Sequence, residues 1–271
     1  MDKPRVAITL ADLRARKARQ QKFSMLTAYD ASFAAAISAA GVDAILVGDS
    51  LGMVVQGHAS TVPVHIAHMV YHTAAVARAN TQCFLLADMP FMAAASDDAA
   101  LRHAARLMRA GAQMVKLEAN PQLPQRIAQL SREGVPVCAH FGLTPQSIHR
   151  LGRYQVQYRG AQGRARLLEH ARAAEAAGAD MLLVECVPAP LAAQLAKEAK
   201  VPVVGIGAGP NVDGQVLVMH DMLGLNSLPK PPRFVENFLT RGDGSVEGAF
   251  RAYHQAVLDG QFPSATHAWS A

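Results

Sequence analysis

The chain is poor in charged side chains and in cysteine. Only 17% of its 271 residues are charged, whereas 51% are hydrophobic. The three cysteines, Cys83, Cys138 and Cys186, form no CxxC pair, and their odd number argues against a disulfide framework. Reduced thiols in or beside apolar runs are typical of a cytosolic protein, so we expect a cytoplasmic location. A surface with little charge is compatible with large subunit interfaces.

Sequence signals for secretion or membrane insertion are also missing. The N-terminus carries Asp2 and Asp12 and only one short apolar stretch, VAITLA, which does not fit a secretory signal peptide. The most apolar window, residues 33–48, is broken by polar residues and a glycine. It is therefore not expected to span a membrane, and we expect no membrane partner.

The net charge of +5 does not indicate a nucleic-acid-binding protein. Much of the excess lies near the N-terminus, in Arg14, Arg16, Lys17, Arg19 and Lys22. No aromatic residues alternate with these side chains and no reader motif accompanies them, so no nucleic-acid partner is expected. We expect one solvated helical face here, with contact to a neighbouring subunit or to an anionic ligand tail as the alternatives.

Short apolar runs alternate with Ala-rich amphipathic segments along most of the chain. Strands are predicted at residues 23–27, 44–48, 83–87, 114–118, 135–139, 181–185, 201–206 and 215–219. Helices are predicted at residues 31–40, 64–79, 97–110, 122–132, 161–177, 190–199 and 231–258, the last interrupted by Gly242, Gly244 and Gly248. Thr9 and Asp12 form a capping-box pattern that predicts a short N-terminal helix at about 9–20.

This alternation indicates an α/β fold with a parallel sheet. Strands that are apolar on both faces and are followed by helices are typical of parallel sheets. Eight such units favour a (β/α)8 TIM barrel, with the barrel at about 22–260 and the whole chain, 1–271, as one domain. The connection 207–214 is too short for a full helix. An open doubly wound sheet is the alternative.

Charged and polar residues lie at the ends of five of the predicted strands. They are Asp49, Asp88, Lys116 with Glu118, His140 and Glu185. Burial of an unpaired charge costs several kcal/mol, so a strand made for burial has no structural use for these residues. In a (β/α)8 barrel the functional site lies at the carboxyl ends of the strands. We therefore expect one shared polar site.

The acidic residues in this set suggest a metal site. Asp49 and Asp88 follow neighbouring strands, about 4.8 Å apart, and would repel each other without a cation between them. Oxygen ligands with water favour Mg²⁺ over Zn²⁺. Glu118 is placed to complete the shell through water. The alternative is that each Asp caps the helix or loop that follows it.

The remaining strand-end residues suggest an anion holder and a base. Lys116 and Glu118 are two residues apart, so both point into the barrel, either as an internal ion pair or with Lys116 holding an anionic substrate. His140 is either a satisfied core residue or part of the site. Glu185 follows four apolar residues, and a carboxyl in such surroundings has a raised pKa and can act as a general base.

Several unusual strings resemble the ketopantoate hydroxymethyltransferase family. They run in the family's order from about residue 22 to 226: MLTAYDASFA, GVDAILVGDSLGMVVQGHAST, DMPF, VKLE, AHFGLTPQ and GIGAGPNVDGQVLVMHDMLGL. The string KLEAN differs from the family's KLEGG in the loop after Glu118, and the region beyond about 235 matches weakly.

The resemblance implies a barrel of the phosphoenolpyruvate mutase and isocitrate lyase superfamily. It implies a transferase of pantothenate biosynthesis that moves a one-carbon unit from the co-substrate 5,10-methylenetetrahydrofolate to 3-methyl-2-oxobutanoate, giving 2-dehydropantoate. It also implies Mg²⁺ as the cofactor and a homodecamer built from dimers as the assembly. The partners would thus be a small 2-oxo acid, a folate and further copies of the chain.

The resemblance also assigns roles to residues by their positions in the matching strings. It assigns metal binding to Asp49 and Asp88, with support from Glu118. It assigns substrate contact to Asp49, Ser50, Asp88 and Lys116. Glu185 would be the proton acceptor, and His140 would lie in the same pocket.

Two other functions are possible. One is a Mg²⁺-dependent 2-oxo acid lyase or mutase, which would use the same metal shell, although no cysteine here follows the Lys-rich string common in such enzymes. The other is a non-catalytic barrel subunit, which would be expected to lack a site carboxylate.

Overall fold

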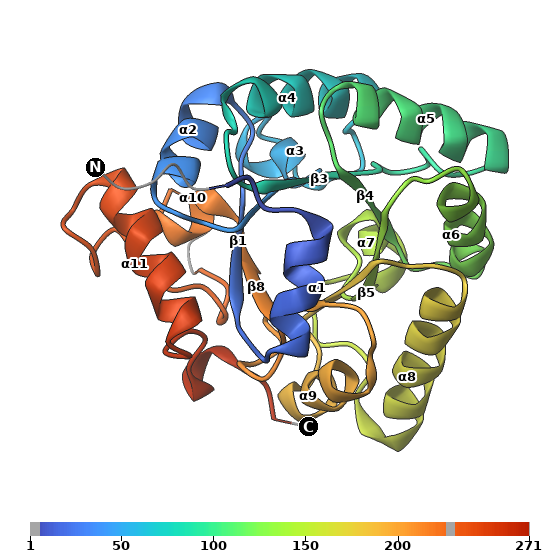
Figure 1. The fold of residues 1–271 in the computed structure, drawn as a ribbon. Coiled ribbons are helices and arrows are strands. Elements are labelled where there is room, and N and C mark those ends of the chain that lie inside the picture. Colours follow the sequence, from blue (N-terminus) through green and yellow to red (C-terminus); the bar gives the residue numbers. More distant parts are fainter. Residues whose placement is uncertain (1–5, 226–230, 271) are drawn as a thin grey trace.

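The chain folds as a closed barrel of eight parallel strands. The structure is a computed structural model that describes residues 6–225 and 231–270. Each strand pairs with the next one in sequence, and β8 closes the barrel against β1 (Figure 1). The strands are β1 (Phe23–Thr27), β2 (Ala44–Val47), β3 (Phe84–Asp88), β4 (Met114–Glu118), β5 (Val137–Gly142), β6 (Met181–Glu185), β7 (Val203–Ile206) and β8 (Gly214–Leu217). The predicted (β/α)8 barrel is confirmed, and the open sheet is wrong.

Helices surround the barrel where the apolar periodicity predicted them (Figure 1). They are α2 (Ala31–Ala39), α4 (Ile66–Ala79), α5 (Asp97–Arg109), α6 (Leu123–Arg132), α8 (Gly160–Ala176), α9 (Ala189–Glu198) and α11 (Val246–Leu258). Each places apolar residues against the strands, as Ala100, Ala104 and Leu107 of α5 do on one face. None of the helices in the described part of the chain is long and apolar enough to cross a membrane.

The N-terminal helix α1 (Leu10–Ala18) lies across the amino end of the barrel. Thr9 and Asp12 form the predicted capping box, in which each side chain bonds the other's backbone N–H. Arg14, Arg16 and Lys17 of this helix pair with aspartates that directly precede β6, β2 and β8. Arg16 and Lys17, predicted to be solvated, are therefore part-buried against the barrel, whereas Arg14 and Arg19 stay exposed; the ion pairs attach α1 to the barrel.

The predicted helix at 231–258 is shorter than expected. Only Val246–Leu258 is helical, whereas residues 231–245 form turns and irregular chain. Pro231 and Pro232 disfavour a helix at the start of this stretch, and Gly242 and Gly244 weaken it further along. Ser245 then begins α11 by accepting a hydrogen bond from the Gly248 N–H at 2.9 Å.

Several short elements lie in the connections at the carboxyl end of the strands. They are α3 (Leu51–Val54), the 3₁₀ turn η1 (Pro145–Ser147), α7 (Ile148–Leu151) and α10 (Met219–Met222), none of which was predicted; a second 3₁₀ turn, η2 (Ala265–His267), follows α11. The connection between β7 and β8 has no helix, as its length predicted. The connection from β2 to α4 contains α3, and the connection from β5 to α8 contains η1 and α7, so both offer extra residues at the end of the barrel where the strand-end side chains lie.

Candidate active site

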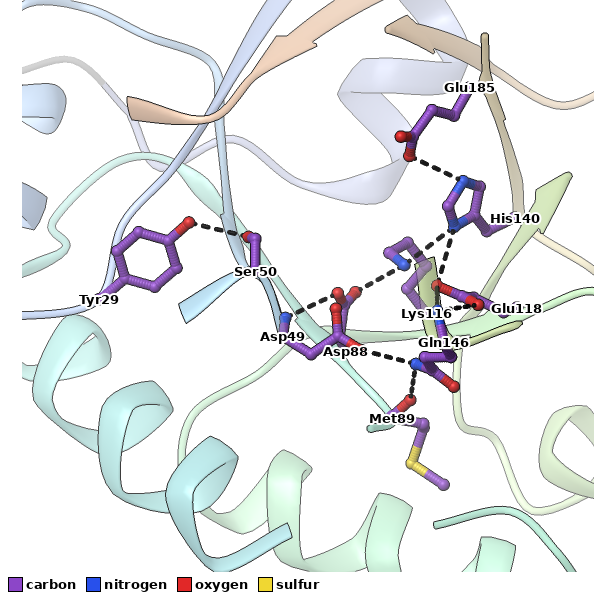
Figure 2. A network of polar contacts seen from close by, with 10 residues as sticks. All are labelled: Tyr29, Asp49, Ser50, Asp88, Met89, Lys116, Glu118, His140, Gln146 and Glu185. Carbon is purple, nitrogen blue, oxygen red and sulfur yellow. Dashed lines mark hydrogen bonds and ion pairs between the residues drawn. The ribbon is translucent and has the colours of Figure 1, made fainter. Parts of the chain in front are cut away.

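Three of the predicted strand-end residues are in direct contact. Asp88 and Lys116 lie opposite each other in β3 and β4, and Asp88 Oδ1 is 3.0 Å from Lys116 Nζ. The backbone N–H of Asp49 donates a 3.0 Å hydrogen bond to Asp88 Oδ2 (Figure 2). Asp49, Asp88 and Lys116 are all buried. The structure therefore brings these three residues together, as the barrel prediction required.

His140 connects Lys116 to Glu185 (Figure 2). Its Nδ1 is 3.2 Å from Lys116 Nζ, and its Nε2 is 3.3 Å from Glu185 Oε2. A protonated lysine has only donors, so His140 Nδ1 must accept from it. A neutral His140 then carries its proton on Nε2, facing Glu185. Glu118 Oε1 lies 3.9 Å from His140 Nδ1, which places the fourth carboxylate at the same cluster.

This cluster, which we call the carboxylate cluster (Asp49, Asp88, Glu118 and Glu185), has little positive charge. Burial and the charge of Asp88 raise the pKa of Asp49 to about 7. Burial, with the charge of Asp49, raises the pKa of Glu118 well above its usual value. Burial likewise raises the pKa of Glu185 to about 8, although Lys116 acts to lower it. Four carboxyl groups thus share one ammonium group.

The pKa values of the two basic residues, Lys116 and His140, shift in opposite directions. Burial acts to lower the pKa of Lys116, but the charges of Asp88, Glu118 and Asp49 outweigh it, so this pKa is raised. Burial and the neighbouring Lys116 charge lower the pKa of His140 well below its ordinary value. Lys116 is therefore the cation of the cluster and His140 is a neutral imidazole, which agrees with the hydrogen-bond assignment.

Ser50 is held at the edge of the cluster by a tyrosine. Its Oγ lies 2.9 Å from the hydroxyl of Tyr29, which is buried. Tyr29 follows β1, and its carbonyl oxygen is 2.6 Å from His72 Nδ1. Sequence reasoning missed Tyr29 as a partner of the site. Its position two residues beyond a strand end, in the string MLTAYDASFA, was the available signal.

Gln146 is a second residue that sequence reasoning missed. Its side-chain amide donates to Asp49 Oδ2 at 2.7 Å and to the carbonyl of Met89 at 2.9 Å. Its backbone N–H donates to Glu118 Oε2 at 3.1 Å (Figure 2). The residue lies in η1, four positions after the end of β5. An uncharged side chain in a loop gave no sign of this contact beyond its place in the string AHFGLTPQ.

A glycine lies against the backbone of Glu185. Gly142 is opposite Glu185 in the β5–β6 register and has a φ of +100°. A Cβ at this position would lie 2.0 Å from the carbonyl oxygen of Glu185. That carbonyl accepts a 2.8 Å hydrogen bond from the next residue, Leu143. Only glycine allows this close approach, and together with the hydrogen bond from Leu143 it holds the Glu185 backbone in place.

The donor set suits a hard divalent cation. All four acidic groups offer oxygen, the ligand type that Mg²⁺ prefers, and the surplus of negative charge would be offset by such an ion. Within residues 6–225 and 231–270, no three His, Cys, Asp or Glu side chains converge as a complete metal shell. The cluster therefore offers oxygen donors and surplus negative charge to such an ion, without a preformed complete shell among these residues.

Solved structures share the barrel. A phosphonopyruvate hydrolase superposes with a TM-score of 0.62 at 16% identity, covering 79% of this chain and 83% of that one. A 2,3-dimethylmalate lyase, described as a member of the PEP mutase/isocitrate lyase superfamily, gives a TM-score of 0.59 at 18% identity, covering 77% and 80%. These likenesses show the class of fold, a (β/α)8 barrel, and the carboxylate cluster lies at the carboxyl end of its strands.

Sequence comparison gives the family. The family model described as ketopantoate hydroxymethyltransferase matches residues 7–265. A 3-methyl-2-oxobutanoate hydroxymethyltransferase 2 of Hahella chejuensis is 54% identical, over 98% of this chain and 100% of that protein. A 3-methyl-2-oxobutanoate hydroxymethyltransferase of Xanthomonas campestris is 57% identical, over 93% and 92%. The chain belongs to the ketopantoate hydroxymethyltransferase family and is an enzyme, a hydroxymethyltransferase.

Proposed function

We propose that the chain transfers the one-carbon unit of 5,10-methylenetetrahydrofolate to 3-methyl-2-oxobutanoate, giving 2-dehydropantoate for pantothenate biosynthesis. The observation that supports this most is the carboxylate cluster with Lys116, found at one end of the barrel in a chain 54% identical to a protein named for this oxo acid. Removal of a proton next to a carbonyl needs a base and a means to stabilise the enolate. The cluster contains candidates for both tasks.

Asp49 and Asp88 would hold Mg²⁺, and Glu118 would support the ion through water. When bound, the cation supplies Lewis-acid polarisation of the 2-oxo group and offsets negative charge there. The Asp49 backbone N–H donates a 3.0 Å hydrogen bond to Asp88 Oδ2, which holds the Asp88 carboxylate beside Asp49.

Glu185 is the proposed base. It removes the proton from C3 of the oxo acid, which leaves the electron pair in the enolate. C3 then forms a bond to the methylene carbon of the folate. That carbon gives up both of its bonds to folate nitrogens: one is replaced by the bond to C3 and the other by the hydroxyl of water. The proton taken by Glu185 and the remaining proton of the water go to the two nitrogens, which leaves tetrahydrofolate. The Nε2–H of His140 faces Glu185 and would orient the carboxylate during the transfer.

Lys116 and Ser50 are the proposed contacts of the substrate's oxygens. The ammonium group of Lys116 is buried, so its attraction for an anion is weakly screened by water. The Ser50 hydroxyl lies 2.9 Å from the Tyr29 hydroxyl, and with the Tyr29 O–H as the donor of that bond the Ser50 O–H can donate to the substrate. Both groups would stabilise the negative charge that develops when Glu185 takes the proton.

Exchange of the C3 hydrogen of 3-methyl-2-oxobutanoate in D₂O tests the base assignment. Glu185→Gln should slow this exchange roughly 10³-fold or more, because an amide cannot accept the proton. Substrate affinity should stay within a few-fold of wild type. The exposed Glu133 offers a matched control, and Glu133→Gln should exchange at the wild-type rate. A wild-type exchange rate in Glu185→Gln would remove Glu185 from this role.

Release of tetrahydrofolate from 5,10-methylenetetrahydrofolate separates this function from the lyase or mutase alternative. Release that depends on both the oxo acid and Mg²⁺ supports the transferase. A lyase or mutase would turn over its own 2-oxo acid without folate. Cys83, Cys138 and Cys186 are all buried, which is unlike the exposed reactive cysteine expected of such a lyase. We also propose a cytoplasmic homodecamer, supported by the family resemblance.

A further inference from the structure

Gln146 contacts two carboxylates of the cluster through two different groups. The backbone N–H reaches Glu118 Oε2 at 3.1 Å, and the side-chain Nε2 reaches Asp49 Oδ2 at 2.7 Å. The same Nε2 also donates to the carbonyl of Met89, the residue after Asp88, at 2.9 Å. One residue of the β5 loop therefore joins the ends of β2, β3 and β4.

The orientation of the Gln146 amide follows from its partners. A carboxylate oxygen and a carbonyl oxygen are both acceptors, so the group between them must be the NH₂, with one hydrogen for each. The backbone around it is also held, because the Ser147 N–H donates to the Thr144 carbonyl at 2.9 Å. The side chain thus has a defined position, and the backbone bond to Glu118 anchors its base.

These contacts place two donors in a region of surplus negative charge. Each N–H partly offsets a carboxylate charge without adding a competing cation. The amide donates to Oδ2 of Asp49, so Oδ1 accepts no bond from Gln146. Hydrogen bonds of this kind to ligating carboxylates typically set metal affinity, and their loss costs about 10–100-fold.

We propose that Gln146 is a positioning residue for the divalent cation, holding Asp49 by its side chain and Glu118 by its backbone in the arrangement that the ion requires. The inference rests on the proposed function, because it presupposes that the ion binds at Asp49 and Asp88. It acts through these ligands and assigns Gln146 no contact with the substrate.

Isothermal titration of the metal-free enzyme with Mg²⁺ or Mn²⁺ tests the proposal. Gln146→Met keeps the length of the side chain and removes the donor, and should raise the Kd of the ion about tenfold or more. Gln146→Asn keeps the amide on a shorter arm and serves as the second variant if Met impairs folding; we expect a weakened affinity there too. At saturating ion, kcat should recover to within a few-fold of wild type.

Gln157 provides the matched control. It is half-buried later in the same connection between β5 and α8, and its Nε2 donates to the Gln155 carbonyl at 3.0 Å rather than to a carboxylate of the cluster. Gln157→Met should leave the Kd of the ion unchanged. Thermal unfolding without metal is measured in parallel. If the Gln146 variants unfold earlier but bind the ion as wild type does, the role is structural and the proposal is overturned.

The same titration distinguishes this inference from the proposed function. If wild type shows no saturable binding of Mg²⁺ or Mn²⁺, or if Asp49→Asn binds as tightly as wild type, the proposed metal site fails and this inference fails with it. If wild type binds, Asp49→Asn does not, and Gln146→Met equals wild type, only the role of Gln146 fails.

Discussion

The two ends of the barrel both bury charge, but they balance it differently. At the amino end, three basic residues of α1 each pair with one aspartate; Arg16 lies 2.9 Å from Asp43 and Lys17 lies 2.8 Å from Asp213. At the carboxyl end, Lys116 is the single ammonium group among Asp49, Asp88, Glu118 and Glu185. One end is matched pair by pair, whereas the other has an excess of negative charge.

The charges at the amino end stabilise the fold, whereas those at the carboxyl end are suited to a reaction. Matched pairs satisfy their own charges, so the amino end needs no further ligand to keep α1 in place. The carboxylate cluster can be neutral only by taking up protons or a cation. The raised pKa values of Asp49 and Glu185 reflect the cost of keeping these buried groups ionised. Substitutions at the two ends should therefore affect different properties of the protein.

The largest effect is expected at the carboxyl end. Asp49→Asn should lower kcat/KM roughly 10³-fold, equivalent to about 4 kcal/mol, because it removes a proposed metal ligand. The free energy of unfolding of the metal-free protein should stay within about 1 kcal/mol of wild type, since one of the surplus charges is removed. Steady-state kinetics and urea denaturation without metal measure the two. A large loss of stability with normal turnover would show that Asp49 serves the fold and not the reaction, contrary to this prediction.

At the amino end we expect a smaller effect, and it should be on stability rather than on activity. Asp43 is fully buried, pairs with Arg16 and accepts the Ser24 N–H at 2.9 Å. Asp43→Asn should lower the free energy of unfolding by about 3 kcal/mol, because it weakens a buried pair from one side. The same urea titration measures this change. The kcat of the folded variant should equal that of wild type, and a loss of kcat with unchanged stability would contradict the structural role.

The smallest expected effect is a pH dependence that belongs to the carboxyl end alone. Burial raises the pKa of Glu185 to about 8, and a base works only when ionised. The rate should therefore fall as pH drops through the folded pKa, by up to tenfold per unit. A bound cation favours the ionised form, so the acid limb should lie between about 4.5 and 8.

A pH profile of kcat/KM for wild type measures this limb. Asp43→Asn should show the same limb, since no group at the amino end takes part in the reaction. A rate that stays flat across this range, or a limb that moves with Asp43→Asn, would contradict the assignment.

Much of the fold could be predicted because the barrel repeats one simple pattern. Eight apolar strands alternated with amphipathic helices, and that alternation fixed the order of neighbours and the end of the barrel at which Asp88 and Glu118 lie. The wrong helix at 231–245 has a local cause, since prolines and glycines there oppose the helix that the apolar periodicity suggested.

The site was less completely predictable. Asp49, Asp88, Lys116, His140 and Glu185 could be found because a charge at the end of an apolar strand is conspicuous. Their mutual contacts depend on side-chain reach, which strand order does not give. Tyr29 and Gln146 contribute through a hydroxyl and an amide on loops, and such groups are common on any protein surface. The tautomer of His140 depends on a lysine in the neighbouring strand.

Gly142 has a consequence for how the enzyme can change in evolution. The position has no side chain to act on substrate, yet any side chain would collide with the backbone of Glu185. Selection on the reaction therefore constrains a residue that takes no part in it. Every amino-acid substitution at position 142 would bring a Cβ against the Glu185 carbonyl and displace the strand that holds the proposed base, so the glycine and Glu185 can be expected to persist or be lost together.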